Sequence, residues 1–243
     1  MAHADQSSQQ VMLFPRSADR TIVQPPSTAG PQAGGLSRAH ALRRILDAHL
    51  AWLAQRPDGV RADFSGATLS DAQLEGVNLS RALFRGTSMI EADLSGADLS
   101  GAVIEGSDLR QASLSRADLA GASLANSDCS LSRLEGANLS EATLQYSSFR
   151  RSELGSARLL EARIRECDFR GAVLTGAGLH HGNLFDTSFG DANMEGAVLY
   201  HARMQLCRFV GAIATDANFG SAHLESCDLR GAALRSARIS AAD

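Results

Sequence analysis

The sequence predicts an all-β solenoid, because one five-residue pattern runs unbroken through about three quarters of its 243 residues. From Phe64 to Ile239, every fifth residue is a core-type apolar residue, in 36 consecutive units. The residue two positions earlier is small in every unit and is alanine in 24 of them. An amphipathic helix repeats at about 3.6 residues and a half-buried strand at about 2, so a period of five fits neither. Such a short fixed period indicates repeats that bury their apolar faces by stacking on one another.

Each unit is expected to form a short extended segment followed by a turn. The apolar residue and the small residue two before it then point inward, while the other three positions face solvent. Units such as ADLSG at 92–96, ADLSG at 97–101 and ANLSE at 137–141 resemble the consensus of the pentapeptide-repeat family, Ala-(Asp/Asn)-Leu-X-X. This resemblance implies a right-handed quadrilateral β-helix with four units per coil. The 36 units would make about nine coils and a rod about 43 Å long.

Four units per coil would place residues 20 apart directly over one another. Phe149, Phe169, Phe189 and Phe209 would then form an aromatic ladder inside the rod, and Phe64 and Phe84 would start a second one. We interpret both ladders as core packing, because these side chains fill the bore and leave no room for a cofactor.

The cysteines do not have the paired spacing of a disulfide framework. Cys167, Cys207 and Cys227 occupy the small inward position of their units, and Cys207 and Cys227 would be neighbours in adjacent coils. We expect all of them to be reduced packing residues.

Three segments are expected along the chain. Residues 1–36 are rich in Ser, Gln, Pro and Gly and lack periodicity, which predicts a disordered tail. Residues 37–61 predict a capping helix and a linker, with Ser37 as the amino-terminal cap and Trp52 helping to cover the first coil. Residues 62–243 form the predicted solenoid, and all five prolines precede it. The last coil has no such cap, so we expect a homodimer to form through it.

Charge is distributed unevenly along the predicted rod. Residues 62–148 carry five Arg and twelve acidic residues, whereas residues 149–243 carry eleven of each. In the acidic half, Asp98 is expected above Asp118 on one face, and Asp108 above Asp128 on the opposite face. The second half begins with a belt of six arginines, interleaved with glutamates: Arg150, Arg151, Arg158, Arg163, Arg165 and Arg170.

One column of histidines suggests a site in the second half. Glu161, His181 and His201 would stack at one corner, and two imidazoles beside a carboxylate are a candidate set of ligands for a divalent transition metal. Chance alignment of outward side chains and a protein contact are the competing explanations. Apolar and aromatic residues also occupy outward positions nearby and predict a protein-interaction surface: Leu160, His180, Phe185, Tyr200, Leu206 and Val210.

These features predict a non-enzymatic protein that presents a rigid surface to a protein partner. The sequence has no nucleophile elbow and no phosphate-binding glycine loop, and we expect no cofactor. The alternative is a DNA-mimicking modulator or protector of DNA gyrase or another type II topoisomerase, because some members of the family act in that way. Direct nucleic-acid binding is disfavoured by the acidic balance and scarce aromatics. No apolar stretch approaches the ~18–20 residues of a membrane span, and residues 11–14 are too short for a signal-peptide core, so a cytoplasmic location is expected.

Overall fold

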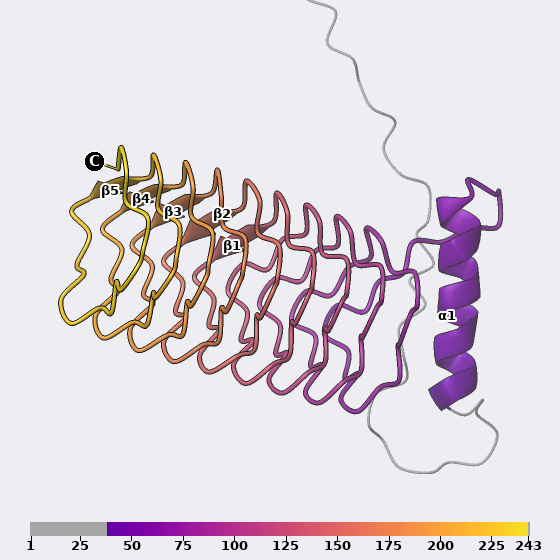
Figure 1. The fold of residues 1–243 in the computed structure, drawn as a ribbon. Coiled ribbons are helices and arrows are strands. Elements are labelled where there is room, and N and C mark those ends of the chain that lie inside the picture. The colour runs from indigo at the N-terminus through magenta and orange to yellow at the C-terminus, as the bar shows by residue number, and fades with distance from the viewer. Residues whose placement is uncertain (1–37, 243) are drawn as a thin grey trace, which may run out of the picture.

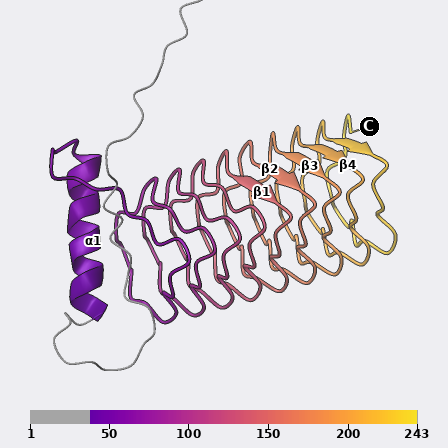
Figure 2. The same cartoon turned by 180° about the vertical axis from the view of Figure 1, so that it is seen from behind.

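The computed structural model describes residues 38–242 and shows a rod of stacked coils with one helix across its end (Figure 1). The predicted tail at 1–36 and the predicted cap residue Ser37 lie outside the described residues. The helix α1, Arg38–Leu53, lies against the first coil, and the coils then follow one another toward the C-terminus, as the reverse view also shows (Figure 2). The all-β solenoid with a helical cap is therefore confirmed.

The coils have a register of 20 residues. On one face, parallel pairing links nine successive levels of the rod, beginning with Asp63, Leu83, Val103 and Ser123. The ladder continues through five three-residue strands in a single parallel sheet of order β1-β2-β3-β4-β5. Their bounds are Thr143–Gln145 for β1, Arg163–Arg165 for β2, Asn183–Phe185 for β3, Arg203–Gln205 for β4 and His223–Glu225 for β5.

The corners explain the polar positions of the repeat. The last residue of every unit from Gly66 to Ala241 has a positive φ, between 43° and 70°. At one such corner the amide of Ala72 donates to the carbonyl of Leu69 over 3.1 Å, with Asp71 at φ 59°, as in a type II turn. The acidic or amide residue before the central apolar residue stabilises the turn. For example, Oδ1 of Asp98 accepts hydrogen bonds from the amide and the hydroxyl of Ser100 at 3.0 and 2.7 Å.

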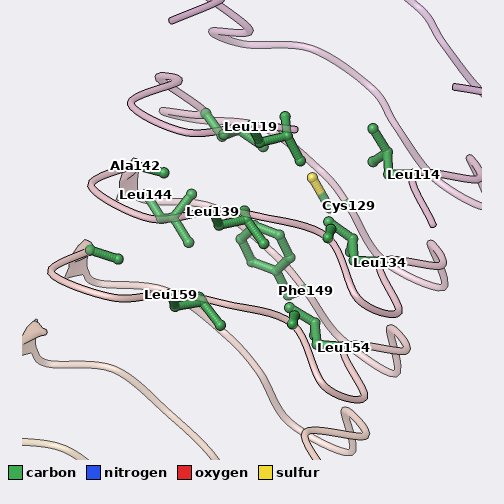
Figure 3. Close-up of a cluster of buried hydrophobic side chains, with 14 of the residues drawn as sticks. Leu114, Leu119, Cys129, Leu134, Leu139, Ala142, Leu144, Phe149, Leu154 and Leu159 are labelled. Atoms are coloured by element: carbon green, nitrogen blue, oxygen red, sulfur yellow. The ribbon is translucent and has the colours of Figure 1, made fainter. Parts of the chain in front are cut away.

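The core consists of the predicted ladders. The rings of Phe149, Phe169, Phe189 and Phe209 stack with successive centroid distances of 4.8, 5.2 and 5.0 Å. The ring of Phe149 points into the rod among leucines of its own and adjacent coils (Figure 3). Phe64 and Phe84 stack at 5.2 Å, so both ladders are confirmed as packing.

At one inner corner of the rod, the small inward position carries a hydroxyl or thiol group in eight successive coils, from Thr87 to Cys227. We call this set the hydroxyl–thiol column. All its members except Thr187 reach the backbone of the preceding coil. For example, the Thr87 hydroxyl donates to the Phe64 carbonyl over 2.8 Å, and the Cys167 thiol donates to that of Leu144 over 3.3 Å. The column therefore adds side-chain hydrogen bonds between coils at one inner corner. Its residues are Thr87, Ser107, Ser127, Ser147, Cys167, Thr187, Cys207 and Cys227.

The cap is fastened by packing and by one buried histidine. Ile45 of α1 belongs to the buried core, and Leu42 and Leu46 pack against it. His49 is fully buried; its Nδ1 accepts a hydrogen bond from the amide of Ala62, and its Nε2 lies 3.1 Å from the carbonyl oxygen of Ser80. The helix thus covers the first coil, as expected.

Candidate functional site

The outer face of the sheet β1–β5 carries an open groove of about 980 Å³. We call it the sheet groove. In each strand the central residue points into the rod, so its two neighbours both point outward and form two rows along the rod. The five strands share one side of the coils farthest from α1 (Figure 1). The groove is lined by Gln145, Arg163, Ile164, Arg165, Asn183, Leu184, Phe185, Arg203, Met204, Gln205, His223 and Glu225.

Two arginines of the groove stand out because they lack an acidic partner. Within residues 38–242, neither Arg163 nor Arg203 forms an ion pair, and both side chains are exposed. Arg150 and Arg170, outside the groove, differ in this respect, because each contacts Asp168, at 3.2 and 2.6 Å. The unpaired guanidinium groups leave positive charge and free hydrogen-bond donors at the groove.

The second outward row combines a cation with an aromatic ring. The guanidinium carbon of Arg165 lies 4.7 Å from the centroid of the Phe185 ring, and its Nε is 3.1 Å from Oε1 of Glu166. The hydrogen bond with Glu166 raises the pKa of Arg165, so that this group is fully charged. Phe185 is half-buried under the arginine and has a fixed position at the groove's edge.

Aromatic residues border the groove on its other side. The rings of His181 and His201 lie 5.2 Å apart, and the ring of Tyr200 is 3.9 Å from that of His201. Tyr200 is 41% exposed. The ring of His180 lies over Gly178, where an added Cβ would be 3.4 Å from its Cε1 and Nδ1 atoms, and this Nδ1 is buried without a hydrogen-bond partner. The stacking of His181 and His201 follows the predicted 20-residue register.

The metal hypothesis receives no support from this geometry. In the described part of the chain, no group of three or more His, Cys, Asp or Glu side chains is placed to hold a metal ion. His181 and His201 are neighbouring rings tilted by 33°, and Glu161 does not complete a coordination set with them.

The predicted interaction residues divide between corners of the rod. Leu160, His180 and Tyr200 share the histidine corner, and Phe185 and Leu206 lie at the opposite edge of the same sheet face. Of the six, Phe185 lines the sheet groove, and Leu160, His180, Tyr200 and Leu206 lie at the corners on either side of the sheet. Val210 does not, because it lies half a coil beyond Tyr200, at a corner that it shares with Gly190.

The row of residues between these two edges is not part of the interaction surface that the sequence predicts. Arg163, Asn183 and Arg203 form the row that links them, at the position before the central apolar residue. The same register of 20 that predicts the histidine column aligns this row, but only Arg163 belongs to a feature that the sequence predicts, the arginine belt. The signal was the occurrence of arginine where other units have Asp, Asn or Ser.

The acidic columns of the first half have the predicted arrangement. Asp98 pairs in register with Asp118, and Asp108 with Asp128. However, Oδ2 of Asp108 is 2.6 Å from Nη2 of Arg110, and Nε of the same arginine is 3.9 Å from Asp128. The hydrogen bond from Arg110 lowers the pKa of Asp108. Part of the negative charge on this face is therefore balanced locally.

Comparisons with known proteins agree with this architecture. The family model described as pentapeptide repeats matches in eight copies between residues 62 and 243. The crystal structure of HetL, a pentapeptide repeat protein involved in heterocyst differentiation regulation in the cyanobacterium Nostoc, is 29% identical over 79% of this chain and 93% of that chain, with a TM-score of 0.48. No curated protein sequence matches significantly.

Two further solved structures show a weaker likeness. QnrB1, a plasmid-mediated fluoroquinolone resistance protein, is 19% identical over 75% of this chain and 90% of its own, with a TM-score of 0.36. A pentapeptide repeat protein from the Arabidopsis thaliana thylakoid lumen is 28% identical over 52% of this chain and 64% of its own, with a TM-score of 0.13. Within residues 38–242, no helix is both long enough and apolar enough to cross a membrane.

Proposed function

Because this chain belongs to the pentapeptide-repeat family, whose model matches it between residues 62 and 243, we propose that it is a non-enzymatic scaffold that binds a protein partner along the sheet groove. A solenoid suits this role, because coils that contact only their neighbours make a long and regular surface. All four cysteines are free thiols, in keeping with the cytoplasm as the compartment of this function.

The observation that carries the proposal is the pair of unpaired arginines in the groove. Arg163 and Arg203 are two strands apart, about 10 Å along the rod. A guanidinium group binds a carboxylate through two parallel hydrogen bonds, and such contacts are among the strongest polar contacts at interfaces. The groove therefore favours a partner with acidic side chains over one with basic side chains.

The shape of the groove favours an extended partner segment. From β1 to β5 the groove is about 19 Å long, which accommodates about six residues of an extended peptide. Phe185 on one edge and Tyr200 on the other provide aromatic surface, the kind of residue that contributes most to binding energy at protein interfaces. The proposed partner segment alternates acidic and apolar residues.

A fluorescence anisotropy titration tests this proposal with a defined probe. The probe is a labelled peptide of alternating Glu and Leu, and a peptide of alternating Lys and Leu serves as the opposite-charge control. We expect the acidic peptide to bind and the Arg163→Ala/Arg203→Ala variant to bind it at least about tenfold more weakly, since each charged hydrogen bond contributes about 1.5–3 kcal/mol.

The chain offers a matched control for this double substitution. Arg133 and Arg235 are exposed arginines on the opposite face, directly before and directly after a central apolar residue respectively, so Arg133→Ala/Arg235→Ala removes equal charge away from the groove. This variant should bind the acidic peptide as the wild type does. Equal affinity of the wild type and the groove variant, or equal weakening by both variants, would contradict a specific site in the groove.

A second candidate function is modulation of a type II topoisomerase by mimicry of DNA. The observation that favours it is the alignment of Asp98 with Asp118 and of Asp108 with Asp128, which repeats negative charge along the rod. A gyrase supercoiling assay, with and without a fluoroquinolone, tests it directly. Wild-type protein should change the product distribution, and Asp98→Asn/Asp118→Asn should lose this effect. Unchanged supercoiling at micromolar protein would remove this candidate.

The proposed scaffold also includes a homodimer formed through the last coil. Ile239 is 58% exposed although its equivalents in earlier coils are buried, and Leu224, Leu229 and Leu234 are only partly buried. A second copy could cover these side chains by stacking its last coil on this one. Light scattering across a range of concentrations should show a dimer for the wild type and a monomer for Ile239→Glu.

A further inference from the structure

Two members of the hydroxyl–thiol column are cysteines in adjacent coils. Cys207 and Cys227 occupy the same inward position, and the strands just before them pair in register as Met204 with Leu224. The pairing continues past the cysteines, because the amide of Asp228, the residue after Cys227, donates to the carbonyl of Cys207 over 2.9 Å. Adjacent strands lie about 4.8 Å apart, which is inside the range of Cα separations that a disulfide spans, about 4.4–6.8 Å.

The two thiols also interact chemically. Interaction with the Cys207 side chain lowers the pKa of Cys227 to about 7, although partial burial and the carboxylate of Glu225 act in the opposite direction. The Cys207 thiol itself donates to the carbonyl of Leu184 over 3.6 Å. The interaction with Cys227, together with burial, raises the pKa of Cys207. Cys227 is therefore the thiol that loses its proton first, and a thiolate is the reactive form of cysteine.

The other cysteines do not have this arrangement. Cys167 belongs to the same column, but Thr187 separates it from Cys207, so these two cysteines are two coils apart. Two coils correspond to about 10 Å, beyond the reach of a disulfide. Cys129 lies fully buried in the column of Phe149, where desolvation raises the pKa of its thiol.

We propose that Cys207 and Cys227 form a reversible intramolecular disulfide when the protein meets hydrogen peroxide, and that this bond fastens the last coil to the one before it. The Cys227 thiolate attacks one peroxide oxygen, so that the O–O bond breaks, hydroxide leaves and Cys227 becomes a sulfenic acid. The Cys207 sulfur then forms the S–S bond, and its proton leaves with the displaced hydroxyl group as water. The two thiols are oxidised by two electrons in all, and one peroxide is reduced to two water equivalents.

Exposure and position make this site accessible. Cys227 is partly exposed, so peroxide can reach it, whereas Cys207 is buried and reacts only with its neighbour. The Cβ atoms of parallel neighbours are about 1 Å farther apart than in a relaxed disulfide. In the described residues of a single copy, the coil that contains Cys227 stacks on one side only and its leucines are partly buried, so in the monomer it can make this small shift.

The test uses the full chain, first reduced and then treated with hydrogen peroxide. Intact mass spectrometry should show the loss of two hydrogens, and peptide mapping under non-reducing conditions should join the peptides of Cys207 and Cys227. Dithiothreitol should restore both thiols. Cys207→Ser should accumulate sulfenic or sulfinic acid at Cys227 instead, and serine already occupies this position at Ser107, Ser127 and Ser147, which makes it a conservative replacement.

A double variant separates this pair from the other thiols. Cys129→Ser/Cys167→Ser should still lose two hydrogens on treatment with hydrogen peroxide.

Hydrogen exchange measures the effect of the bond on the coil. In wild-type protein, exchange of backbone amides in residues 223–242 should slow by about tenfold or more on oxidation, because the bond limits opening of that coil. The proposal would be overturned if wild-type Cys227 were oxidised while Cys207 remained a thiol, or if the cross-link joined two chains.

Discussion

The amide of Ala62 donates a hydrogen bond to Nδ1 of His49 across 3.1 Å, and this contact joins the capping helix to the first coil. Because Nδ1 accepts this bond, the ring's proton is on Nε2, which donates to the carbonyl of Ser80 over 3.1 Å. Only the neutral imidazole can make both bonds. Burial lowers the pKa of His49, and the positive charge of Arg61 acts in the same direction.

The docking of the cap should therefore depend on pH. Since the pKa of His49 is lower in the folded protein than its ordinary value of 6.5, the unfolded state binds the proton more readily. The contribution of His49 to stability is complete above pH 6.5 and decreases as the pH falls below that value, by up to about 1.4 kcal/mol per pH unit.

The fluorescence of Trp52 can follow this change, because it is the sole tryptophan and its ring stacks on that of His49 at 5.6 Å. We expect an acid transition in the wild type and in His40→Gln, a control in the same helix. The transition should disappear in His49→Ala, which should be destabilised at every pH. A transition that persists in His49→Ala would assign the titration to another group.

Gly59 should be essential for the approach of the linker to α1. A Cβ added there would lie 2.3 Å from the backbone nitrogen of Trp52 and 2.4 Å from its Cα. Side-chain rotation cannot relieve a clash with backbone atoms. Gly59→Ala should therefore displace the linker and cost about 3 kcal/mol or more. Thermal unfolding would measure the loss, and Asp58→Ala, at the exposed neighbouring residue, should leave the melting temperature nearly unchanged.

The corners predict a stabilising substitution. Leu131 has a φ of 61° and is 49% exposed, so it has a left-handed backbone that L-residues disfavour and little packing to lose. Leu131→Gly should raise the stability by about 0.5 kcal/mol after allowing for the greater freedom of glycine in the unfolded chain. Leu131→Ala retains the unfavourable φ and should show no such gain. A lower melting temperature for the glycine variant than for the alanine variant would contradict this account.

The aromatic ladder should tolerate leucine better than alanine. Phe169 lies between Phe149 and Phe189, at 4.8 and 5.2 Å. Phe169→Ala should cost about 3–5 kcal/mol, because it leaves a cavity in a closely packed core. Phe169→Leu should cost less, since Leu69 and Leu109 occupy the same column in earlier coils. Denaturant titration would compare them, and equal losses would contradict this account, because they would mean that the volume of leucine does not replace the ring.

The fold was predictable because each five-residue unit carries the same local pattern of small, polar and apolar residues. The ladder from Phe149 to Phe209 follows from counting by 20 once four units are known to close a coil, and that number came from the resemblance and not from the period alone. The hydrogen bonds of His49 were not predictable in this way. Its position on the apolar side of the helix indicated burial, but its partners depend on how α1 docks on the first coil, which no repeat specifies.

The candidate site was predictable only in part, for a similar reason. The histidine corner and Phe185 drew attention because aromatic and apolar residues are unusual at outward positions. Arg163 was notable only as a member of the arginine belt and Arg203 was not notable at all, because charged residues are common on a solvated surface. Their importance depends on the absence of an acidic partner within the described residues, and this requires knowledge of which side chains reach one another.

The 20-residue pairing also constrains how such a rod can change in length. Removing 20 residues, for example 103–122, would shorten the rod by one coil and leave every later side chain pointing in its original direction. Removing only five would rotate everything downstream by a quarter turn, so that Arg163 and Arg203 would face a different side relative to α1. Insertions and deletions in this protein should therefore preserve its binding geometry only in multiples of a whole coil.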